Sequence, residues 1–373
     1  MSFKLPRYQE LTNPQRTILN LQQGKNYLIT GAPGTGKSVI ALYRASDLCQ
    51  NKNKKVLMLV FNKPLMFYIS SAVKSLKINA EVATWQSWIL SFYKKTIRRF
   101  CPEENWVYDW VQIKKDFESV GKQYDEIIMD EAQDIPLELI EAVQLIAGAV
   151  TCFMDTNQTI NLDKCTDQAD VEDALGVRKP YVLYENFRNT KPIFDFAKLF
   201  NPDVTAEPVR LKGTKPMMIQ CSGYGHAAPT QLTSKMIQIL KRNFALNYIG
   251  VFTNTGAQWK TYQELKEQLP DSNVYLYKSS SRDYSTIDFD NPGIYVLTFN
   301  TMKGLEFDAV LIPRCECIDT KNNDQIDRNM FYVAITRASE KVYCFYFNPY
   351  SSSKYIDVFK PIKGNEEILN WEK

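Results

Sequence analysis

One short string constrains the fold of this chain more than any other feature. Residues 31 to 38 read Gly-Ala-Pro-Gly-Thr-Gly-Lys-Ser, the pattern of a phosphate-binding loop or Walker A motif. Such a loop must follow a strand and open a helix. The apolar run 26–30 predicts the strand, and residues 38–49 predict the helix. The chain is therefore expected to contain an α/β domain that binds a phosphorylated nucleotide.

The residue types in this string suit phosphate chemistry. Small residues let backbone N–H groups surround the phosphates, and the helix N-terminus adds positive potential. The backbone cradle is predicted at Gly31, Gly34, Thr35 and Gly36. Lys37 is expected to reach the outer phosphates, and Ser38 to be a ligand of magnesium. ATP and Mg²⁺ are the cofactors that this site predicts.

A second run places carboxylates at the end of an apolar strand. The strand is expected at 125–130 and is followed directly by Glu131. In a P-loop protein, the metal partner belongs at the carboxyl end of such a strand. Asp130 is predicted to hold Mg²⁺ through water, and Glu131 to polarise the attacking water as a general base.

Strand-like runs alternate with helical stretches along most of the 373 residues, a pattern typical of parallel α/β domains. Two such series occur. In the first, strands are expected at 26–30, 55–61, 81–84, 125–130 and 150–154. In the second, they are expected at 181–184, 217–221, 248–252, 274–277, 294–299, 310–313 and 342–347. The stretch 161–179 has the weakest pattern, so the predicted domains are 1–170 and 171–373.

Composition excludes several classes of protein. Apolar residues make up 45% and charged residues 23%, which is close to the soluble average. No apolar run is long enough to span a membrane, and the N-terminus does not resemble a secretory signal. A cytoplasmic protein without a membrane partner is expected. Cys315 and Cys317 lack a second pair at zinc spacing, and His226 is the only histidine, so a structural zinc site is not predicted.

A net charge of +3 implies that any surface for nucleic acid is local. The nearest candidate is 92–100, where basic and aromatic residues interleave as they would along a strand-binding groove. A solvated helix face explains this segment equally well.

The string 130–134, Asp-Glu-Ala-Gln-Asp, resembles the corresponding motif of the UvrD/Rep family of superfamily 1 helicases. Five further segments resemble motifs of that family and follow in its order. They are residues 11–16, 155–158, 186–189, 301–308 and 332–338. The resemblance covers nearly the whole chain. It implies two tandem RecA-like P-loop domains, each a mostly parallel sheet flanked by helices, with ATP in the cleft between them.

The resemblance implies four contacts to the nucleotide outside the P-loop. Gln15 would pair with the edge of the adenine, and the ring of Phe187 would stack on it. Gly304 and Glu306 would lie on the nucleotide side of a motif that touches ribose and nucleic-acid backbone.

Three further residues would act on the transferred phosphoryl group. By resemblance, Gln158 senses the γ-phosphate, while Arg188 and Arg337 reach across the cleft, Arg337 as an arginine finger. Both arginines belong to the second predicted domain and the P-loop to the first, so charge stabilisation is complete only when the domains close. Hydrolysis would thereby be tied to domain motion.

The resemblance also points to a track of single-stranded nucleic acid, with DNA favoured over RNA and movement from 3′ to 5′. The implied contact residues are Phe61, Asn62, Thr84, Trp85, Thr298 and Asn300. Aromatic rings that stack on bases suit sequence-independent tracking. A place for Phe61 and for the nearby Trp88 in the apolar core is the alternative, and the residues themselves do not distinguish DNA from RNA.

The chain departs from the family where large insertions are usual. The first insertion spans at most 89–123, and 278–292 holds only a short loop. Residues 159–162 also lack the stacking ring and arginine common after the third motif, and Asn300 stands where a histidine is common. A helicase or translocase that unwinds duplex poorly without a protein partner is therefore expected. The alternative is a nucleotide-switch ATPase subunit of a larger nucleic-acid-processing or defence complex.

Overall fold

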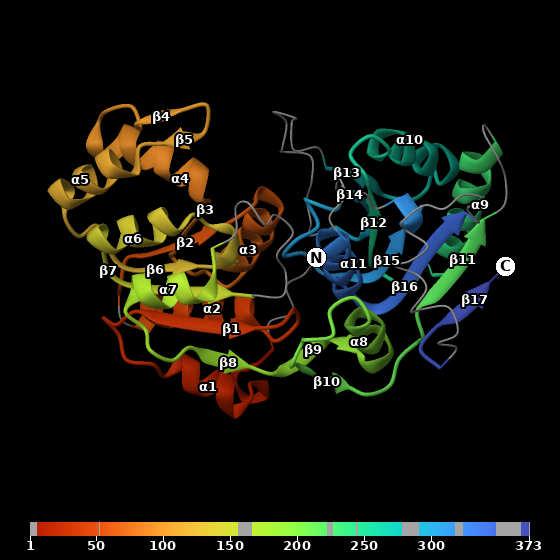
Figure 1. Cartoon of the computed structure of the whole chain (residues 1–373), viewed down its shortest axis with the longest axis horizontal. Coiled ribbons are helices and arrows are strands. Elements are labelled where there is room, and N and C mark those ends of the chain that lie inside the picture. Colours follow the sequence, from red (N-terminus) through yellow and green to blue (C-terminus); the bar gives the residue numbers. More distant parts are fainter. Residues whose placement is uncertain are drawn as a thin grey trace. The chain divides into compact units, whose positions relative to one another are not determined.

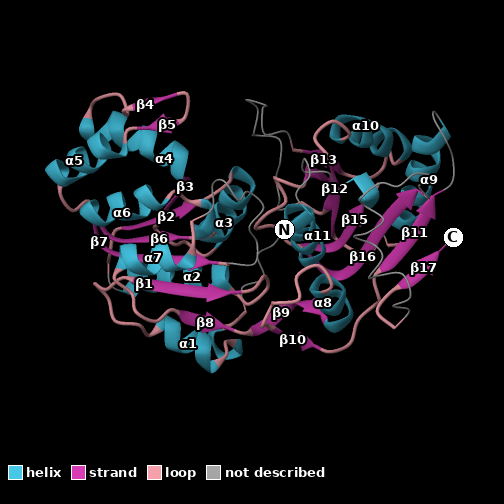
Figure 2. Cartoon of the chain, in the orientation of Figure 1, coloured by secondary structure: helices cyan, strands magenta, loops and turns pink. Residues whose placement is uncertain are grey.

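The computed structural model describes residues 6–51, 53–155, 166–221, 227–243, 245–277, 291–317, 324–347 and 367–372. The chain divides into two compact units, residues 2–184 and 185–373, called here the N-terminal and C-terminal units. Figure 1 colours the first from red to yellow-green and the second from green to blue. In each unit, helices flank a parallel sheet (Figure 2).

The N-terminal unit contains six parallel strands in the order β3-β2-β6-β7-β1-β8. The strands are β1 (Tyr27–Gly31), β2 (Val56–Val60), β3 (Glu81–Thr84), β6 (Tyr124–Met129), β7 (Ala147–Met154) and β8 (Tyr181–Leu183). Its helices include α1 (Asn13–Leu19), α2 (Lys37–Ser46), α3 (Lys63–Ser75), α6 (Leu137–Ile146) and α7 (Gln168–Leu175). All five residues of β2 are buried, as expected for a strand covered on both faces. Because all six strands are parallel, the loops that follow them meet at one edge of the sheet.

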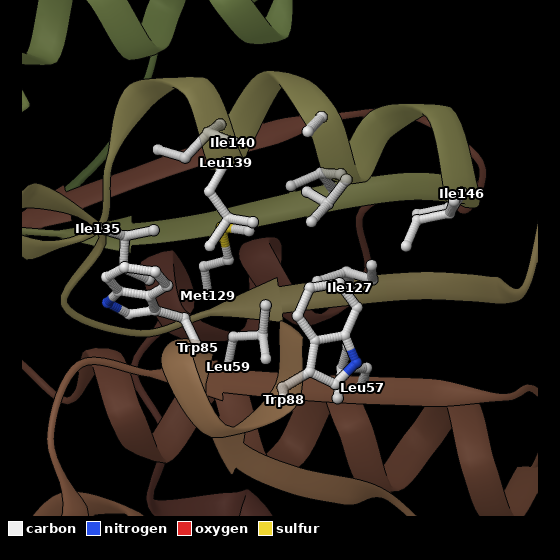
Figure 3. Packing of buried hydrophobic residues seen from close by; sticks show 14 of the residues in the cluster. Leu57, Leu59, Trp85, Trp88, Ile127, Met129, Ile135, Leu139, Ile140 and Ile146 are labelled. Atoms are coloured by element: carbon white, nitrogen blue, oxygen red, sulfur yellow. The ribbon is translucent and has the colours of Figure 1, made fainter. Parts of the chain in front are cut away.

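A small insertion connects β3 to β6. It consists of α4 (Trp85–Phe92), a two-stranded hairpin of β4 (Glu103–Glu104) and β5 (Val107–Tyr108), and α5 (Trp110–Val120). Its aromatic rings pack on one another, with centroids 6.0 Å apart for Trp88 and Phe117. Figure 3 shows Trp85 and Trp88 within the apolar cluster formed by β2, β6 and α6. The insertion is thus anchored in the core of the unit.

The hairpin turn holds a tryptophan in a backbone conformation that favours glycine. Asn105 and Trp106 have φ values of 52° and 66°, the signs of a type I′ turn, in which Asn-Gly is preferred. The left-handed region costs a bulky residue about 1–2 kcal/mol, and the residue Trp106 is 68% exposed. We expect Trp106→Gly to increase the free energy of unfolding by about 0.5–1 kcal/mol. Urea denaturation followed by circular dichroism measures this change, and a loss of stability would mean that the ring packs on the protein.

A buried ion pair crosses the interior of the N-terminal unit. The guanidinium of Arg44 on α2 binds the carboxylate of Glu126 on β6, and the two side chains are 3% and 2% exposed. The hydroxyl of Thr151 on β7 also donates to Glu126, at 2.7 Å. Composition and spacing do not predict this pair, because an isolated arginine and glutamate usually lie at the surface.

We expect Arg44→Leu to lower the free energy of unfolding by about 3–5 kcal/mol, because the Glu126 carboxylate then stays buried with only the Thr151 hydroxyl. The adjacent pair of Lys54 and Asp125 is the control, since its side chains are 39% and 41% exposed. Lys54→Ala should cost less than about 1 kcal/mol. Urea denaturation of the full chain compares the two variants. Equal losses in the free energy of unfolding would refute the expected difference between the buried and the exposed ion pair.

The C-terminal unit contains seven parallel strands in the order β13-β14-β12-β15-β16-β11-β17. The strands are β11 (Met217–Cys221), β12 (Tyr248–Thr253), β13 (Val274–Leu276), β14 (Gly293–Thr298), β15 (Phe307–Ile312), β16 (Ala338–Phe347) and β17 (Asn370–Glu372). A separate parallel pair is formed by β9 (Glu185–Thr190) and β10 (Glu207–Arg210). The helices are α8 (Lys191–Lys198), α9 (Ala227–Arg242), α10 (Gln258–Gln268) and α11 (Asp324–Thr336).

The expected α/β class with parallel sheets is confirmed in both units. The assignment of the strand at 181–184 to the second domain was wrong. It is β8, which pairs with β1 in register Ile29 to Tyr181 and is therefore an edge strand of the first sheet. The units consequently divide after Tyr184, later than the predicted boundary at 170. No helix within the described ranges has the length and apolar character needed to cross a membrane.

Candidate nucleotide-binding site

The predicted P-loop connects β1 to α2, as its sequence pattern requires. Gly34 and Gly36 have φ values of 78° and 90°, a region that residues with a Cβ seldom adopt. Gly31 is needed for a different reason, because a Cβ there would lie 2.7 Å from Thr35 Oγ1. Gly36 is the N-cap of α2, and no side chain caps that helix. Backbone N–H groups at this end suit an anion such as a phosphate.

The ammonium group of Lys37 lies on the P-loop itself. Its Nζ donates to the carbonyl oxygens of Gly31 at 2.6 Å and Ala32 at 3.1 Å. Asp155 Oδ2 is 3.5 Å away. Asp155 follows β7, which lies between β6 and β1, so the strand order brings this carboxylate to the loop. The Lys37 ammonium group is therefore held at the P-loop by two backbone carbonyl oxygens and one carboxylate.

Ser38 and Asp130 meet although 92 positions separate them in the sequence. Ser38 Oγ donates to Asp130 Oδ2 at 2.5 Å. Burial, together with the neighbouring carboxylate of Glu131, raises the pKa of Asp130 above its usual range, while the Ser38 hydrogen bond and Lys37 act in the opposite direction. A buried anionic group that is costly to ionise favours a divalent cation beside it. The hydroxyl and the carboxylate are hard oxygen donors that fit Mg²⁺.

Glu131 is the second carboxylate at this edge and has a left-handed backbone, with φ 55°. Its Oε2 accepts a hydrogen bond from Gln133 Nε2 at 2.6 Å. Gln133 Oε1 in turn accepts from the backbone N–H of Asp155 at 3.0 Å. Gln133 therefore links the predicted general base to the end of β7. Sequence reasoning missed this role, although Gln133 stands within the string that carried the family resemblance.

Gln15 lies against the P-loop from outside. Its Nε2 donates to the Thr35 carbonyl oxygen at 3.2 Å, and its Oε1 accepts from the Thr12 backbone N–H at 3.0 Å. A Cβ at Gly36 would lie 2.7 Å from Gln15 Nε2, so the side chain also depends on that glycine. The structure thus places Gln15 beside the loop, with its amide engaged by backbone groups.

In the C-terminal unit, the predicted nucleotide residues gather around the junction of α11 and β16. The guanidinium of Arg188 on β9 binds the carboxylate of Glu306, with Nε 2.7 Å from Oε1, and its Nη1 lies 3.3 Å from the Thr336 carbonyl oxygen. Arg337 Nε donates to the Val333 carbonyl oxygen at 3.1 Å. Three predicted motifs that are distant in sequence therefore meet within this unit.

The structure describes two of the three remaining predicted nucleotide residues, Gly304 and Phe187. Gly304 has a φ of 82°, a conformation that favours glycine. Phe187 is half-buried and lies next to Arg188 on β9. Gln158 lies outside the described residues.

The predicted nucleic-acid residues lie at the carboxyl ends of three strands or directly after them. Phe61 comes directly after β2 and is half-buried, and Asn300 comes after β14 and is exposed. Two others act as helix caps: Asn62 Oδ1 accepts from Leu65 N at 2.8 Å, and Thr84 Oγ1 accepts from Ser87 N at 3.4 Å. These caps give the two side chains a structural reason to be present.

Trp85 and Thr298 also have contacts within the protein. Trp85 belongs to the apolar core with its ring 5.4 Å from that of Tyr108, so it does not offer an exposed stacking surface (Figure 3). The backbone N–H of Thr298 donates to Thr301 Oγ1 at 3.0 Å. Sequence alone could not separate a surface ring from a core ring at the start of α4.

The basic and aromatic segment 92–100 divides between core and surface. Phe92 and Tyr93 are buried in the insertion, and Arg99 forms an ion pair with Asp116. Its exposed residues are Lys94, Lys95, Thr96, Arg98, Arg99 and Phe100. A groove lined by the whole segment is not formed.

Comparisons with known proteins match both units. Residues 24–195 match the model described as Schlafen group 3, DNA/RNA helicase domain, and residues 293–344 match the UvrD-like helicase C-terminal domain. The first range contains the P-loop and Asp130, and the second contains Glu306 and Arg337.

One curated relative and one solved structure are similar to parts of the chain. The "Putative ATP-dependent DNA helicase R568" of Acanthamoeba polyphaga mimivirus is 29% identical over 200 residues, which are 46% of this chain and 27% of that protein. The chain thus spans about a quarter of that protein's length. A crystal structure of the C-terminal domain of a possible DNA helicase from a Lactobacillus matches 50% of this chain and 99% of its own, at 18% identity and a TM-score of 0.37. The two matched domains follow in the order expected from the motifs, so the chain is similar to UvrD-like helicases in both of its units.

Proposed function

We propose that this chain is an ATP-driven helicase or translocase that moves along single-stranded nucleic acid. One observation carries the proposal: the P-loop, Ser38, Asp130 and Glu131 assemble at the carboxyl edge of one parallel sheet. Such an edge is where α/β proteins bind nucleotides. The similarity to helicase domains adds the expectation that nucleotide turnover serves nucleic-acid processing.

In the proposed mechanism, each group at this edge has one task. The N–H groups of the P-loop and Lys37 would bind the phosphates of ATP, and Ser38 and Asp130 would hold Mg²⁺, Asp130 through water. When bound there, Mg²⁺ would supply positive charge to the phosphate oxygens. Glu131 orients the attacking water and takes its proton, with its carboxylate fixed by Gln133.

The C-terminal unit would complete the reaction. Arg188 and Arg337 would stabilise the negative charge of the transferred phosphoryl group, and Gln158 would sense the γ-phosphate. Gln15, Phe187, Gly304 and Glu306 would bind the adenosine side. Because the catalytic groups are divided between two units, ATP turnover would require those units to close on the nucleotide.

The track is proposed to be single-stranded DNA rather than RNA, with movement from 3′ to 5′. The mimivirus relative carries the name of a DNA helicase, whereas the Schlafen family model names both DNA and RNA. Phe61, Asn62 and Asn300 follow strand ends and are proposed to contact the track, together with Thr84 and Thr298. A partner protein would support unwinding of duplex, because the insertion between β3 and β6 is short.

The experiment is steady-state ATP hydrolysis by the full chain, alone and with poly(dT) or poly(rU). We expect poly(dT) to raise the turnover number strongly and poly(rU) to raise it less. Greater stimulation by poly(rU) would reassign the track to RNA. Turnover that neither polymer changes would contradict a motor and favour a nucleotide switch controlled by a protein partner.

A further inference from the structure

Arg337 is the single residue between α11, which ends at Thr336, and β16, which begins at Ala338. Its own carbonyl oxygen accepts a hydrogen bond from the Phe307 backbone N–H at 2.9 Å. The carbonyl oxygens on either side of it, those of Thr336 and Ala338, both accept from Asn189 Nδ2, at 3.2 and 2.6 Å. Three consecutive carbonyl groups around Arg337 are therefore bound by other segments of the unit.

The Asn189 amide uses its hydrogen-bonding capacity on these contacts. Its two N–H donors serve two carbonyl groups, and its Oδ1 accepts from Asn186 Nδ2 at 2.9 Å. Asn186 Oδ1 in turn accepts from the backbone N–H groups of Arg188 and Asn189, at 3.0 and 2.9 Å. Asn189 is fully buried. Both its position and the orientation of its amide are thus fixed from the side of β9.

Few side chains can replace Asn189 here. The bridge needs one short group with two N–H donors, because the two carbonyl groups are separated by a single residue. Aspartate has the same shape but donates no hydrogen bond when ionised, and alanine leaves carbonyl oxygens without this partner. Arg188 Nη1 also contacts the Thr336 carbonyl oxygen, so the same bridge joins the strand that carries Arg188 to the backbone that carries Arg337.

We propose that Asn189 is a positioning residue that sets the backbone from which Arg337 acts in ATP hydrolysis, and that it fixes Arg337 relative to Arg188. The inference rests on the proposed function, in which both arginines stabilise the transferred phosphoryl group. Asn189 touches neither ATP nor water in this role. Its effect reaches the reaction only through the position of Arg337.

The test compares Asn189→Ala with Asn243→Ala in the full chain. Asn243 is the matched control, because its buried amide also contacts a carbonyl oxygen, that of Ile239 at 2.7 Å, and a side chain, Tyr343. We expect Asn189→Ala to lower kcat for ATP by about 10- to 100-fold, since small displacements of a catalytic group have effects of this size. The KM for ATP should change by less than about threefold, because a group that acts in the transition state affects kcat. Asn243→Ala should leave kcat near that of the wild type.

Thermal unfolding of both variants separates positioning from general destabilisation. If Asn189→Ala does not fold, Asn189→Ser replaces it, and the single hydroxyl donor of serine should give a kcat between those of the wild type and Arg337→Ala. Equal losses of kcat in the Asn189 and Asn243 variants, or a raised KM with unchanged kcat, would overturn the inference.

The same substitution in an Arg337→Ala background gives the decisive comparison. If Asn189 acts through Arg337, adding Asn189→Ala should lower kcat by less than about twofold, because coupled positions are not additive. If Asn189→Ala lowered kcat in the Arg337→Ala background by the same factor as in the wild type, the inference would be overturned. The proposed function would not be affected by that result. A wild-type chain that does not hydrolyse ATP would instead overturn the proposed function, and the inference with it.

Discussion

Glu131→Gln is expected to lower the rate of ATP hydrolysis by about 10²- to 10⁴-fold, the contribution typical of a positioned general base. Glutamine preserves the shape of the side chain and can still accept the hydrogen bond from Gln133 Nε2. It cannot take a proton from water, so binding should survive while turnover fails. Stopped-flow or steady-state phosphate release measures the rate, and a fluorescent ADP analogue measures binding.

Glu138→Gln is the control for this substitution. Glu138 lies in the first turn of α6, a few residues beyond Glu131, and is exposed. Its substitution removes the same charge from the same part of the unit and should leave turnover unchanged. If Glu131→Gln retained wild-type turnover, the base would have to be another residue.

Arg337→Ala is expected to lower kcat about 10³-fold or more, the loss typical of an arginine finger, which is the role proposed for Arg337. The guanidinium contacts the carbonyl oxygens of Val333 and Leu305, at 3.1 and 3.5 Å, and would exchange them for phosphate oxygens. Arg337→Lys should recover little of this loss, because an ammonium group lacks the planar fork of donors that matches a phosphate. Steady-state kinetics in saturating ATP and poly(dT) checks both variants.

The exposed Arg242, at the end of α9, supplies the control for loss of positive charge from the C-terminal unit. Arg242→Ala should keep kcat within about twofold of the wild type, as is usual for a surface substitution. The affinity for nucleotide should be similar in Arg337→Ala, Arg337→Lys and Arg242→Ala. A drop in affinity without a drop in kcat would give Arg337 a role in binding instead of catalysis.

Local patterns in the sequence predicted most of the fold. The spacing of Gly34 and Gly36 encodes the positive φ values of the P-loop, and a run of five apolar residues encodes the buried strand β2. The helical spacing of Leu139, Ile140, Val143 and Ile146 likewise encodes helix α6, whose buried face these residues form. These features depend on neighbours in sequence, so one sequence suffices to predict them.

Features that depend on distant contacts were not predictable. The place of β8 depends on its pairing with the distant strand β1, and the pattern of residues 181–183 is equally compatible with either sheet. The bridges made by Gln133 and Asn189 depend on which carbonyl groups the folded chain brings to their amides. The sequence is compatible with a surface or a core position for the ring of Trp85, and only the packing of α4 shows that it lies in the core.

Movement along the track is measured most directly by displacement of streptavidin from biotin-labelled single-stranded DNA. With ATP, the wild-type chain should displace streptavidin from the 5′ end faster than from the 3′ end, and Glu131→Gln should displace it from neither. Active, DNA-stimulated hydrolysis without displacement from either end would contradict a translocating motor and leave a nucleotide switch.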